Sequence, residues 1–411
     1  MRGRERGTRP SVARSHSVSP ALAACPHRPP CAGCPRFGEP GIAPAAQAAL
    51  DQLARLNGLP QTPLVSEGGS GFRLRARLAI RGHVGSPKLG LFELDSHRVV
   101  HIPNCRVHHP LINRVASVVR RALVETKMTC YSDRAHLGLA RYLQVVVERS
   151  TETAQVVLVV NSADVAPAAA CLDLIVQRLG SDLHSLWFNG NCTRSNTILG
   201  ADFVHWCGPR SVIERFGGAA VHYPPGAFGQ SNLGIAERII DFVRARIPPG
   251  ASIMEYYAGV GAIGLSLLPE PARVTMNEVS PHSLHGLELG IAQLDAVERE
   301  KITVLPGEAG AVQAGAGLPG AVQAGLADGA DAQVVIADPP RKGLDPALTQ
   351  RLCEHPPERF LYVSCSLDSL CRDAAQLTAG GKLRLEELAA FNLLPYTEHV
   401  ETVARFERVS C

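Results

Sequence analysis

The sequence predicts an α/β protein whose C-terminal half is a doubly wound, mainly parallel β-sheet. Strand-like apolar runs alternate strictly with helical segments after about residue 225, and this alternation is typical of doubly wound sheets. Before residue 210, short alternating runs and amphipathic segments indicate a separate mixed α/β region. With 411 residues the chain is too long for one ordinary domain, and its 45% hydrophobic content is typical of globular proteins. Two or three domains are therefore expected.

The N-terminal half divides into a tail and two structured parts. Residues 1–24 are rich in Arg and Ser and poor in acidic residues, and we expect a disordered basic tail there, although an organelle transit peptide has a similar composition. Residues 25–110 begin in a Pro- and Gly-rich segment and lead into a central α/β region at 111–210. The elements expected are a helix at 43–57, strands within 71–103, a helix at 110–127, strands at 139–148 and 154–161, a helix at 166–179 and a strand at 183–189.

The C-terminal half, residues 211–411, carries the strict alternation. The elements expected are a helix at 230–246, strand 252–257, helix 261–268, strand 273–278, helix 281–295, strands 302–305 and 332–338, helix 345–354, strand 359–365, helix 367–379 and late strands at 382–391 and 397–408. Residues 306–331 interrupt this rhythm with two copies of GAVQAG and are predicted to be a low-complexity insertion. Ligands of doubly wound sheets bind at the carboxyl ends of the strands, so functional residues are sought there.

The composition excludes several classes of protein. No apolar run approaches the roughly 18 residues that a membrane-spanning helix needs, so no membrane association is expected. The net charge of +3 does not indicate a strongly basic nucleic-acid binder, but the basic residues are almost all arginine, which offers planar donors for phosphate. The N-terminus lacks the long apolar segment of a secretory signal, so a cytoplasmic location is expected.

A glycine-rich turn after the first predicted strand of the C-terminal half is a candidate cofactor site. The segment EYYAGVG at 255–261 ends that strand, and Gly259 and Gly261 let the backbone approach a ligand closely. The next strand ends in Glu278, whose carboxylate can accept hydrogen bonds from a ribose diol. An adenosine-containing cofactor is therefore expected. With Gly264 the spacing also fits GxGxxG, so NAD stays open at this point.

Reactive side chains follow three other predicted strands. Asp338 and Arg341 lie in DPPRKG directly after a central strand, and a carboxylate with a guanidinium exceeds what a turn requires. Cys365 ends the next strand just before a helix, and the helix dipole with a nearby arginine is expected to lower the pKa of its thiol. Glu398 and Glu401 lie near the start of the last strand, where solvated surface charges are the favoured interpretation from these residues alone.

Taken together, these segments resemble the RNA uracil-5-methyltransferase family, whose members use S-adenosylmethionine. The resemblance covers most of the chain, from Cys25 to about Phe406, and rests on motifs that occur in the family's order. The motifs are PPGAFGQSN at 224–232, EYYAGVGAIG at 255–264, ADPPRKGL at 337–344, LYVSCSLDSLCRD at 361–373 and TEHVET at 397–402, with NCTRSNTILG at 191–200 as a further similar segment. The resemblance implies a doubly wound, Rossmann-like methyltransferase domain at 211–411, preceded by an α/β region that binds RNA.

The chemistry that the resemblance implies accounts for the residue types. A thiolate that adds to C6 of uracil turns the ring into an enolate, which can attack a methyl sulfonium from C5. A base must then remove the C5 proton so that the thiolate is expelled. The resemblance implies Cys365 as the nucleophile and Glu401, rather than Glu398, as the base. The binding residues that it implies are Gln230, Tyr257, Glu278 and Asp338 for S-adenosylmethionine, and Arg341 for the RNA or the uracil edge.

Four of the 12 cysteines form a candidate metal site. Cys25, Cys31 and Cys34 are clustered, and Cys105 follows later in the chain. In a cytoplasmic protein such a cluster indicates metal or cluster binding rather than disulfides, and spacing alone leaves a four-cysteine zinc site open. The resemblance implies that these cysteines hold a [4Fe-4S] cluster with a structural role, as in members that modify 23S rRNA. Because the chain starts close to Cys25, a member without the small N-terminal RNA-binding barrel is expected.

Alternative substrates and functions stay open at this point. The cysteine cluster favours 23S rRNA as the substrate, and the tRNA T-loop is the alternative. A cytosine-5-methyltransferase also uses a cysteine, but places it beside the proline of the DPP-like segment, where this chain has Arg341. A non-catalytic RNA-binding or ribosome-assembly factor of the same fold is supported only by Ser366-Leu367, which stand where Asn-Pro is usual in the family. A monomer is expected.

Overall fold

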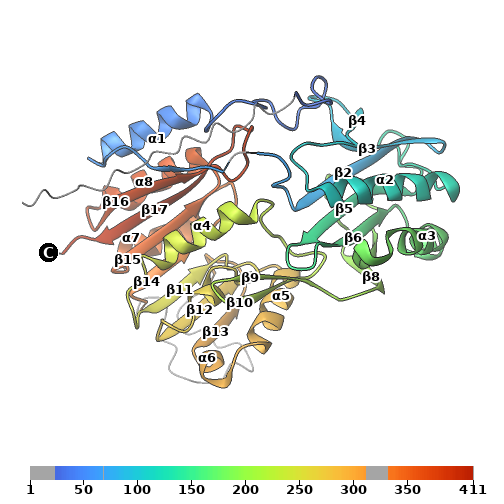
Figure 1. The fold of residues 1–411 in the computed structure, drawn as a ribbon. Coiled ribbons are helices and arrows are strands. Elements are labelled where there is room, and N and C mark those ends of the chain that lie inside the picture. The colour runs from blue at the N-terminus through green and yellow to red at the C-terminus, as the bar shows by residue number, and fades with distance from the viewer. Residues whose placement is uncertain (1–23, 68, 312–331, 411) are drawn as a thin grey trace, which may run out of the picture.

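Two large β-sheets, one in each half of the chain, organise the structure (Figure 1). The protein is represented by a computed structural model that describes residues 24–67, 69–311 and 332–410. The predicted tail at 1–24 lies outside the described residues except for Ala24, and the predicted insertion at 306–331 does so from residue 312 onward.

The central region forms a seven-stranded sheet that is antiparallel apart from one pair. Its strands are β2 (Arg75–His83), β3 (Ser86–Phe92), β4 (Val99–His101), β5 (Ala140–Glu148), β6 (Thr153–Val160), β7 (Leu183–Gly190) and β8 (Asp202–Cys207). They are ordered β4-β3-β2-β5-β6-β7-β8, and only β6 and β7 run parallel. The helices of this region are α2 (Pro110–Glu125), α3 (Ala169–Leu179) and the 3-10 turns η1 (Ala166–Ala168) and η2 (Gly180–Asp182). Alternate strand residues such as Leu143 and Val145 enter a core beneath α2 and α3.

A hairpin and one helix connect the two sheets. The hairpin consists of β9 (Val212–Phe216) and β10 (Ala219–Tyr223), and the helix is α4 (Leu233–Arg244). Gln144 of β5 donates a hydrogen bond to the carbonyl oxygen of Pro225 at 2.7 Å. Arg149, just after β5, pairs with Glu214 of the hairpin at 2.8 Å. These contacts hold the loop before α4 against the central sheet.

The C-terminal half forms an eight-stranded sheet in which only β17 is antiparallel to the rest. Its strands are β1 (Leu64–Val65), β11 (Ser252–Tyr256), β12 (Arg273–Glu278), β13 (Ile302–Pro306), β14 (Val334–Ala337), β15 (Arg359–Ser364), β16 (Leu383–Phe391) and β17 (Glu401–Arg408). They are ordered β1-β16-β17-β15-β14-β11-β12-β13. Its helices are η3 (Gly264–Leu267), α5 (Pro281–Ala292), α6 (Ala296–Glu300), α7 (Pro346–Glu354) and α8 (Leu367–Ala379).

Alternate residues of this second sheet enter separate cores on its two faces. On β11, Ile253 packs with α4 and the β9–β10 hairpin, whereas Met254 packs with α7 and α8 on the other face. Polar caps begin the helices at the strand ends: Asn232 accepts a backbone N–H at the start of α4, and Asp345 does so at the start of α7. Helices on both faces of a mainly parallel sheet make this half doubly wound, as predicted.

An N-terminal segment crosses to the C-terminal sheet. Helix α1 (Pro44–Leu56) buries Leu50 and Leu53 in the core that contains α7 and α8, and β1 pairs in parallel with β16 (Figure 1). The sequence-based prediction groups these residues with the segment 25–110 that opens the central region. The structure places residues 42–65 on the C-terminal sheet, because the apolar face of α1 packs with α7 and α8, which come much later in the sequence.

The predicted elements are present with few exceptions. The helix predicted at 261–268 is reduced to η3, because Gly259 and Gly261 form turns with φ of 59° and 81° and Pro269 follows. Strands β8, β9 and β10 were not among the predicted elements. Within the described ranges no helix combines the length and the apolar character that a membrane span requires.

Candidate active site

Three strands of the C-terminal sheet bring the predicted cofactor residue Asp338 and the predicted catalytic residues Cys365 and Glu401 to one edge. Asp338 follows β14 and Cys365 follows β15, while Glu401 is the first residue of β17. Because β17 runs antiparallel to β15, its start lies beside the end of β15, and the last pair in register is Ser364 with Thr402. The Thr402 hydroxyl also donates to the carbonyl oxygen of Ser364 at 3.1 Å. Continuing this antiparallel register by one residue on each strand places Cys365 beside Glu401.

The surroundings of Cys365 keep its thiol neutral. Burial raises the pKa of Cys365 to about 11, with further contributions from the Glu401 and Asp338 carboxyl groups, while Arg341 acts in the opposite direction. The predicted lowering of this pKa is therefore wrong. Helix α8 does begin directly after Cys365, with Ser366 as its cap. The helix dipole is outweighed, because the thiol is half-buried beside two carboxyl groups.

Glu401 is a buried carboxyl group at the same edge. It is 5% exposed, and its Oε1 atom has no hydrogen-bond partner among the described residues. Burial and the neighbouring Asp338 raise the pKa of Glu401 well above its usual value, and Arg341 opposes that shift. A carboxyl group with a raised pKa can accept and hold a proton, which suits a general base. Glu398, the alternative base, is exposed.

Two further carboxyl groups lie behind this edge. Burial raises the pKa of Asp338 to about 7. Burial also raises the pKa of Glu255, near the end of β11, to about 8, and Asp338 adds to that shift. Glu255 is 2% exposed, and within the described residues its Oε2 atom has no partner. Carboxyl groups in one buried site share protons at neutral pH, because it is unfavourable to ionise them all.

Arg341 supplies a positive charge to this acidic site. It is exposed in the loop after β14, and its Nη2 atom lies 3.2 Å from Nε2 of His399. Its charge acts to lower the pKa of both Cys365 and Glu401. The predicted substrate-binding residue therefore lies next to the predicted catalytic pair.

Helix α8 fixes the loop 338–345 that carries Arg341. Asp373 of α8 is 2% exposed, and its Oδ2 atom accepts from the Leu344 N–H at 3.0 Å and from the Tyr362 hydroxyl at 2.8 Å. The neighbouring Arg372 donates to Oδ1 of Asp373 at 2.8 Å and to a carbonyl oxygen of the loop at 2.6 Å. One buried carboxylate thus connects the loop to both α8 and β15.

We expect Asp373→Ala to lower the free energy of unfolding by about 2–4 kcal/mol, because the substitution leaves the buried Leu344 N–H and Tyr362 hydroxyl without their acceptor. Urea unfolding followed by circular dichroism measures this change. Gln376→Ala, on the exposed face of the same helix, is the matched control and should stay within about 0.5 kcal/mol of the wild type. An Asp373→Ala protein as stable as the control would contradict this role.

Glu278, one of the predicted cofactor residues, is hydrogen-bonded to the turn after β11. The Gly259 N–H donates to Oε2 of Glu278 at 2.8 Å, and Oε1 of Glu278 accepts from the N–H groups of Val279 and Ser280 at 2.9 and 2.6 Å. These bonds fix the carboxylate at the carboxyl end of β12. The positive φ of Gly259 is a conformation that other residues rarely adopt, and no atom lies within 4 Å of where a side chain would begin there. The turn is therefore open to a ligand.

Two other predicted cofactor residues come from different elements. Tyr257 follows β11 with a φ of 60°, and its hydroxyl accepts from the Asp345 N–H at 3.0 Å, so its ring connects the turn to the loop after β14. Gln230 lies in the loop before α4, two residues ahead of the cap Asn232. Strand ends therefore bring together Tyr257, Glu278 and Asp338, whereas Gln230 belongs to the connection between the two sheets.

Comparison with known proteins identifies the family. The family model described as tRNA (Uracil-5-)-methyltransferase matches residues 211–409. An uncharacterized RNA methyltransferase of Protochlamydia amoebophila is 32% identical over 401 residues, which cover 95% of this chain and 99% of the relative. The chain belongs to the RNA uracil-5-methyltransferase family. An uncharacterized RNA methyltransferase of Geobacter sulfurreducens is also similar, with 30% identity over 81% of this chain and 65% of the relative.

A solved structure agrees with the fold of this uracil-5-methyltransferase. The tRNA (uracil-54, C5)-methyltransferase of Pyrococcus abyssi, solved in complex with S-adenosyl-L-homocysteine, superposes with a TM-score of 0.69 over 88% of this chain and 83% of that chain, at 23% identity. This likeness confirms the predicted α/β methyltransferase fold, and the family model with the similar RNA methyltransferases confirms the predicted enzyme class. The alternative that the glycine-rich turn binds NAD is not supported by the family match.

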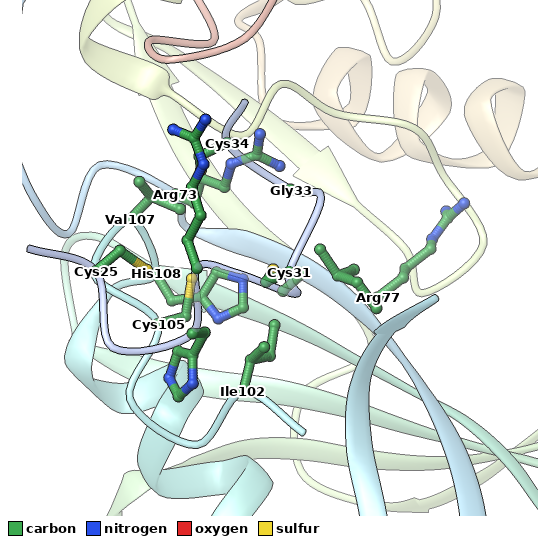
Figure 2. A pocket seen from close by; sticks show the side chains of 14 residues that line it. Cys25, Cys31, Gly33, Cys34, Arg73, Arg77, Ile102, Cys105, Val107 and His108 are labelled. Carbon is green, nitrogen blue, oxygen red and sulfur yellow. The ribbon is translucent and has the colours of Figure 1, made fainter. Parts of the chain in front are cut away.

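In this family member the four predicted ligand cysteines line one cavity of about 80 Å³ (Figure 2). The cavity is bordered by Cys25, Cys31, Cys34 and Cys105, together with Arg73 and His108. Burial raises the pKa of Cys34 to about 11 and also raises the pKa of Cys105. Over the residues that the structure describes, no group of three or more His, Cys, Asp or Glu side chains is arranged to hold a metal ion. The four cysteines therefore border a common cavity, and the metal centre itself is a matter for proposal.

The sequence-based search for site residues in this methyltransferase missed two buried supports. Asp373 was overlooked inside the motif that contains Cys365, although an acidic residue on the apolar face of a helix, between Leu370 and Leu377, is a usable signal. Asn277 is 1% exposed on β12, and its side-chain amide donates to the carbonyl oxygens of Leu305 and Gly307 at 2.9 and 2.8 Å. A polar residue at an inward position of a buried strand was the corresponding signal.

Proposed function

We propose that this chain transfers a methyl group from S-adenosylmethionine to C5 of a uridine in RNA. The observation that carries the proposal is the juxtaposition of Cys365 and Glu401 where β15 ends and β17 begins, with Asp338 and Arg341 against them. A thiol that can become a nucleophile stands beside a carboxyl group that can take a proton, and a cation lies next to both. These are the groups that C5 methylation of uracil requires.

The proposed reaction has three steps. Cys365 first loses its thiol proton to solvent, the resulting thiolate bonds to C6 of uracil, and the C5–C6 π electrons move onto the C4 carbonyl to give an enolate. C5 of this enolate bonds to the methyl carbon of S-adenosylmethionine, and the carbon–sulfur bond breaks to release S-adenosylhomocysteine. Glu401 then takes the proton from C5, the C5–C6 double bond re-forms, and the C6–sulfur bond breaks to return the thiolate. Arg341 stabilises the negative charge that the first step requires.

The proposed cofactor site uses Gln230, Tyr257, Glu278 and Asp338. Glu278 ends β12 with its carboxylate fixed by backbone N–H groups, which is where doubly wound sheets bind a ribose diol. The open space at Gly259 leaves room for the rest of the ligand. The fold shared with the Pyrococcus abyssi enzyme, whose structure contains S-adenosyl-L-homocysteine, supports this assignment.

The proposed substrate is 23S rRNA, bound by the central region at 111–210 and presented to a catalytic domain at 211–411. The cysteine-lined cavity supports this choice, because the resemblance implies a [4Fe-4S] cluster in members that modify 23S rRNA. The tRNA named in the family description and for the Pyrococcus abyssi enzyme supports a tRNA substrate instead. In either RNA the uridine must leave its stack to reach Cys365, which favours a loop or a bulge. We propose that the enzyme acts as a monomer in the cytoplasm.

Nucleoside mass spectrometry tests the proposal. The 5-methyluridine content of purified 23S rRNA and of tRNA is compared between the wild type and a deletion strain, with a strain that carries the Cys365→Ala gene as the matched control. Loss from 23S rRNA in both altered strains is the expected result. Loss from tRNA alone would keep the reaction and change the substrate. No loss in either RNA, with no redundant enzyme present, would promote a non-catalytic RNA-binding or ribosome-assembly role.

We also propose that Cys25, Cys31, Cys34 and Cys105 hold a [4Fe-4S] cluster. The four cysteines border one cavity of about 80 Å³ together with Arg73, His108 and apolar side chains, and a four-cysteine zinc site is the alternative. Thiolate sulfur is the usual ligand of iron–sulfur clusters, and the group would fix the N-terminal segment to the central sheet.

We expect Cys34→Ser to reduce the bound iron and acid-labile sulfide of anaerobically purified protein by more than half, because the substitution removes one of four thiolates. Iron and sulfide analysis with visible absorption spectroscopy measures the loss. Cys130→Ser, a half-buried cysteine outside the cavity, is the control and should retain the wild-type content. Stoichiometric zinc without sulfide in the wild-type protein would replace the cluster with a zinc site.

A further inference from the structure

His399 contacts the cation of the site but has no part in the proposed reaction. It lies in the loop between β16 and β17, two residues before Glu401, and its Nε2 atom is 3.2 Å from Nη2 of Arg341. A guanidinium can only donate hydrogen bonds. Nε2 of His399 must therefore be the acceptor, which makes the imidazole neutral with its proton on Nδ1.

The charges that face His399 favour this neutral form. Partial burial lowers the pKa of His399, and Arg341, from the loop after β14, and Arg73, from the segment before β2, lower it further. Glu398, its neighbour in the chain, acts in the opposite direction. Two cations from two different elements thus oppose protonation, and one of them is the hydrogen-bond donor itself.

The loop that carries His399 is held in place. The His399 N–H donates to Oγ1 of Thr397 at 3.2 Å, and the Thr397 hydroxyl donates to the Leu394 carbonyl oxygen at 2.7 Å. Arg36, from the cysteine-rich segment, donates its backbone N–H to the Tyr396 carbonyl oxygen at 3.0 Å. The imidazole is therefore an acceptor attached to a fixed loop.

We propose that His399 is a positioning residue whose neutral imidazole holds the Arg341 guanidinium against Cys365 and Glu401. The proposal rests on the proposed function, in which Arg341 stabilises the thiolate. Arg341 is exposed, and an exposed arginine without a fixed acceptor samples many rotamers in water, so that its charge is averaged over a larger volume. Fixing the guanidinium keeps its positive charge where the thiolate forms.

The test measures the thiol directly, without RNA or S-adenosylmethionine. Wild type, His399→Ala and His399→Gln are alkylated with iodoacetamide over a pH series, and modification of the Cys365 peptide is followed by mass spectrometry. His399→Ala should slow alkylation at pH 8.5 by roughly three- to tenfold, because loss of a nearby cation raises a thiol pKa by a fraction of a unit to one unit. His399→Gln should stay within about twofold, since its amide oxygen still accepts from arginine. Glu398→Gln is the control in the same loop and should not slow alkylation.

A double-mutant comparison decides whether His399 acts through Arg341. In an Arg341→Ala background, His399→Ala should add no further slowing. Steady-state methylation should show a lower kcat for His399→Ala with the KM for S-adenosylmethionine unchanged. An unaltered alkylation profile in His399→Ala, or an equal further loss in the Arg341→Ala background, would overturn the proposal. If the alkylation results hold while nucleoside analysis finds no methylation, the proposed function fails and the positioning of Arg341 by His399 stands.

Discussion

Cys365→Ala should abolish methyl transfer and leave the protein folded. The thiolate is the group that makes C5 of uracil nucleophilic, and a neutral hydroxyl or water is a much weaker nucleophile, so we expect a loss of at least ~10³-fold in kcat. Cys365 lies at the end of β15 and is only half-buried, so the free energy of unfolding should change by less than about 1 kcal/mol. Transfer of labelled methyl groups from S-adenosylmethionine to RNA measures the activity, and urea unfolding measures the stability.

Cys371→Ala is the matched control for that experiment. Cys371 is a half-buried cysteine of α8 that packs in the core with α1 and α7, and the reaction does not use it. Its replacement should keep activity within about twofold of the wild type, which shows that loss of a cysteine near β15 is not itself harmful. If Cys365→Ala retained more than about a tenth of the activity, a different group would be the nucleophile. The methylation would then follow a route without a covalent adduct to Cys365.

The placement of the candidate catalytic residues at one edge of the sheet could be predicted from the sequence, because each of them lies where a strand begins or ends, whereas their roles were implied by the family resemblance. The order of strands and helices in a doubly wound sheet is local information, since apolar runs and their spacing mark the elements. Once those elements are known, Asp338 and Cys365 fall at the same edge without any knowledge of side-chain contacts. Glu401 joins them because the last strand runs in the opposite direction, so that its start, not its end, lies at that edge.

The electrostatics of the site could not be predicted in the same way. The helix that follows Cys365 suggested a lowered thiol pKa, but burial in the folded protein raises it, and so do two carboxyl groups that are distant in sequence. The packing partner of α1 could not be predicted for a similar reason. An amphipathic pattern shows that one face of a helix is buried, but it does not show which element covers that face. The role of Asp373 depends on Leu344 and Tyr362, which meet only when the loop closes over α8.

Glu401→Gln should stop the reaction after methyl transfer and trap the enzyme on its RNA. The substitution keeps the size of the side chain but removes the group that accepts the C5 proton, so the C6–sulfur bond cannot break. We expect a protein–RNA adduct that survives denaturation, one methyl group transferred per enzyme, and turnover reduced by at least ~10³-fold. Denaturing gel electrophoresis with labelled RNA detects the adduct, and labelled S-adenosylmethionine counts the methyl groups.

Glu401→Gln should slow turnover but make the Cys365 thiol more reactive. The two effects separate the role of Glu401 as the proton acceptor from the effect of its negative charge on the thiol. Above the raised pKa of Glu401 its carboxylate charge raises the thiol pKa, so at the alkaline end of the pH series a neutral glutamine should lower that pKa and speed alkylation several-fold. Glu398→Gln, at an exposed position three residues earlier, should neither trap RNA nor change alkylation. Faster alkylation together with normal turnover would leave the charge effect intact but assign the proton to another base, with Asp338 as the nearest candidate because burial raises its pKa to about 7. Slower alkylation would contradict the placement of Glu401 beside Cys365, on which the whole reaction scheme depends.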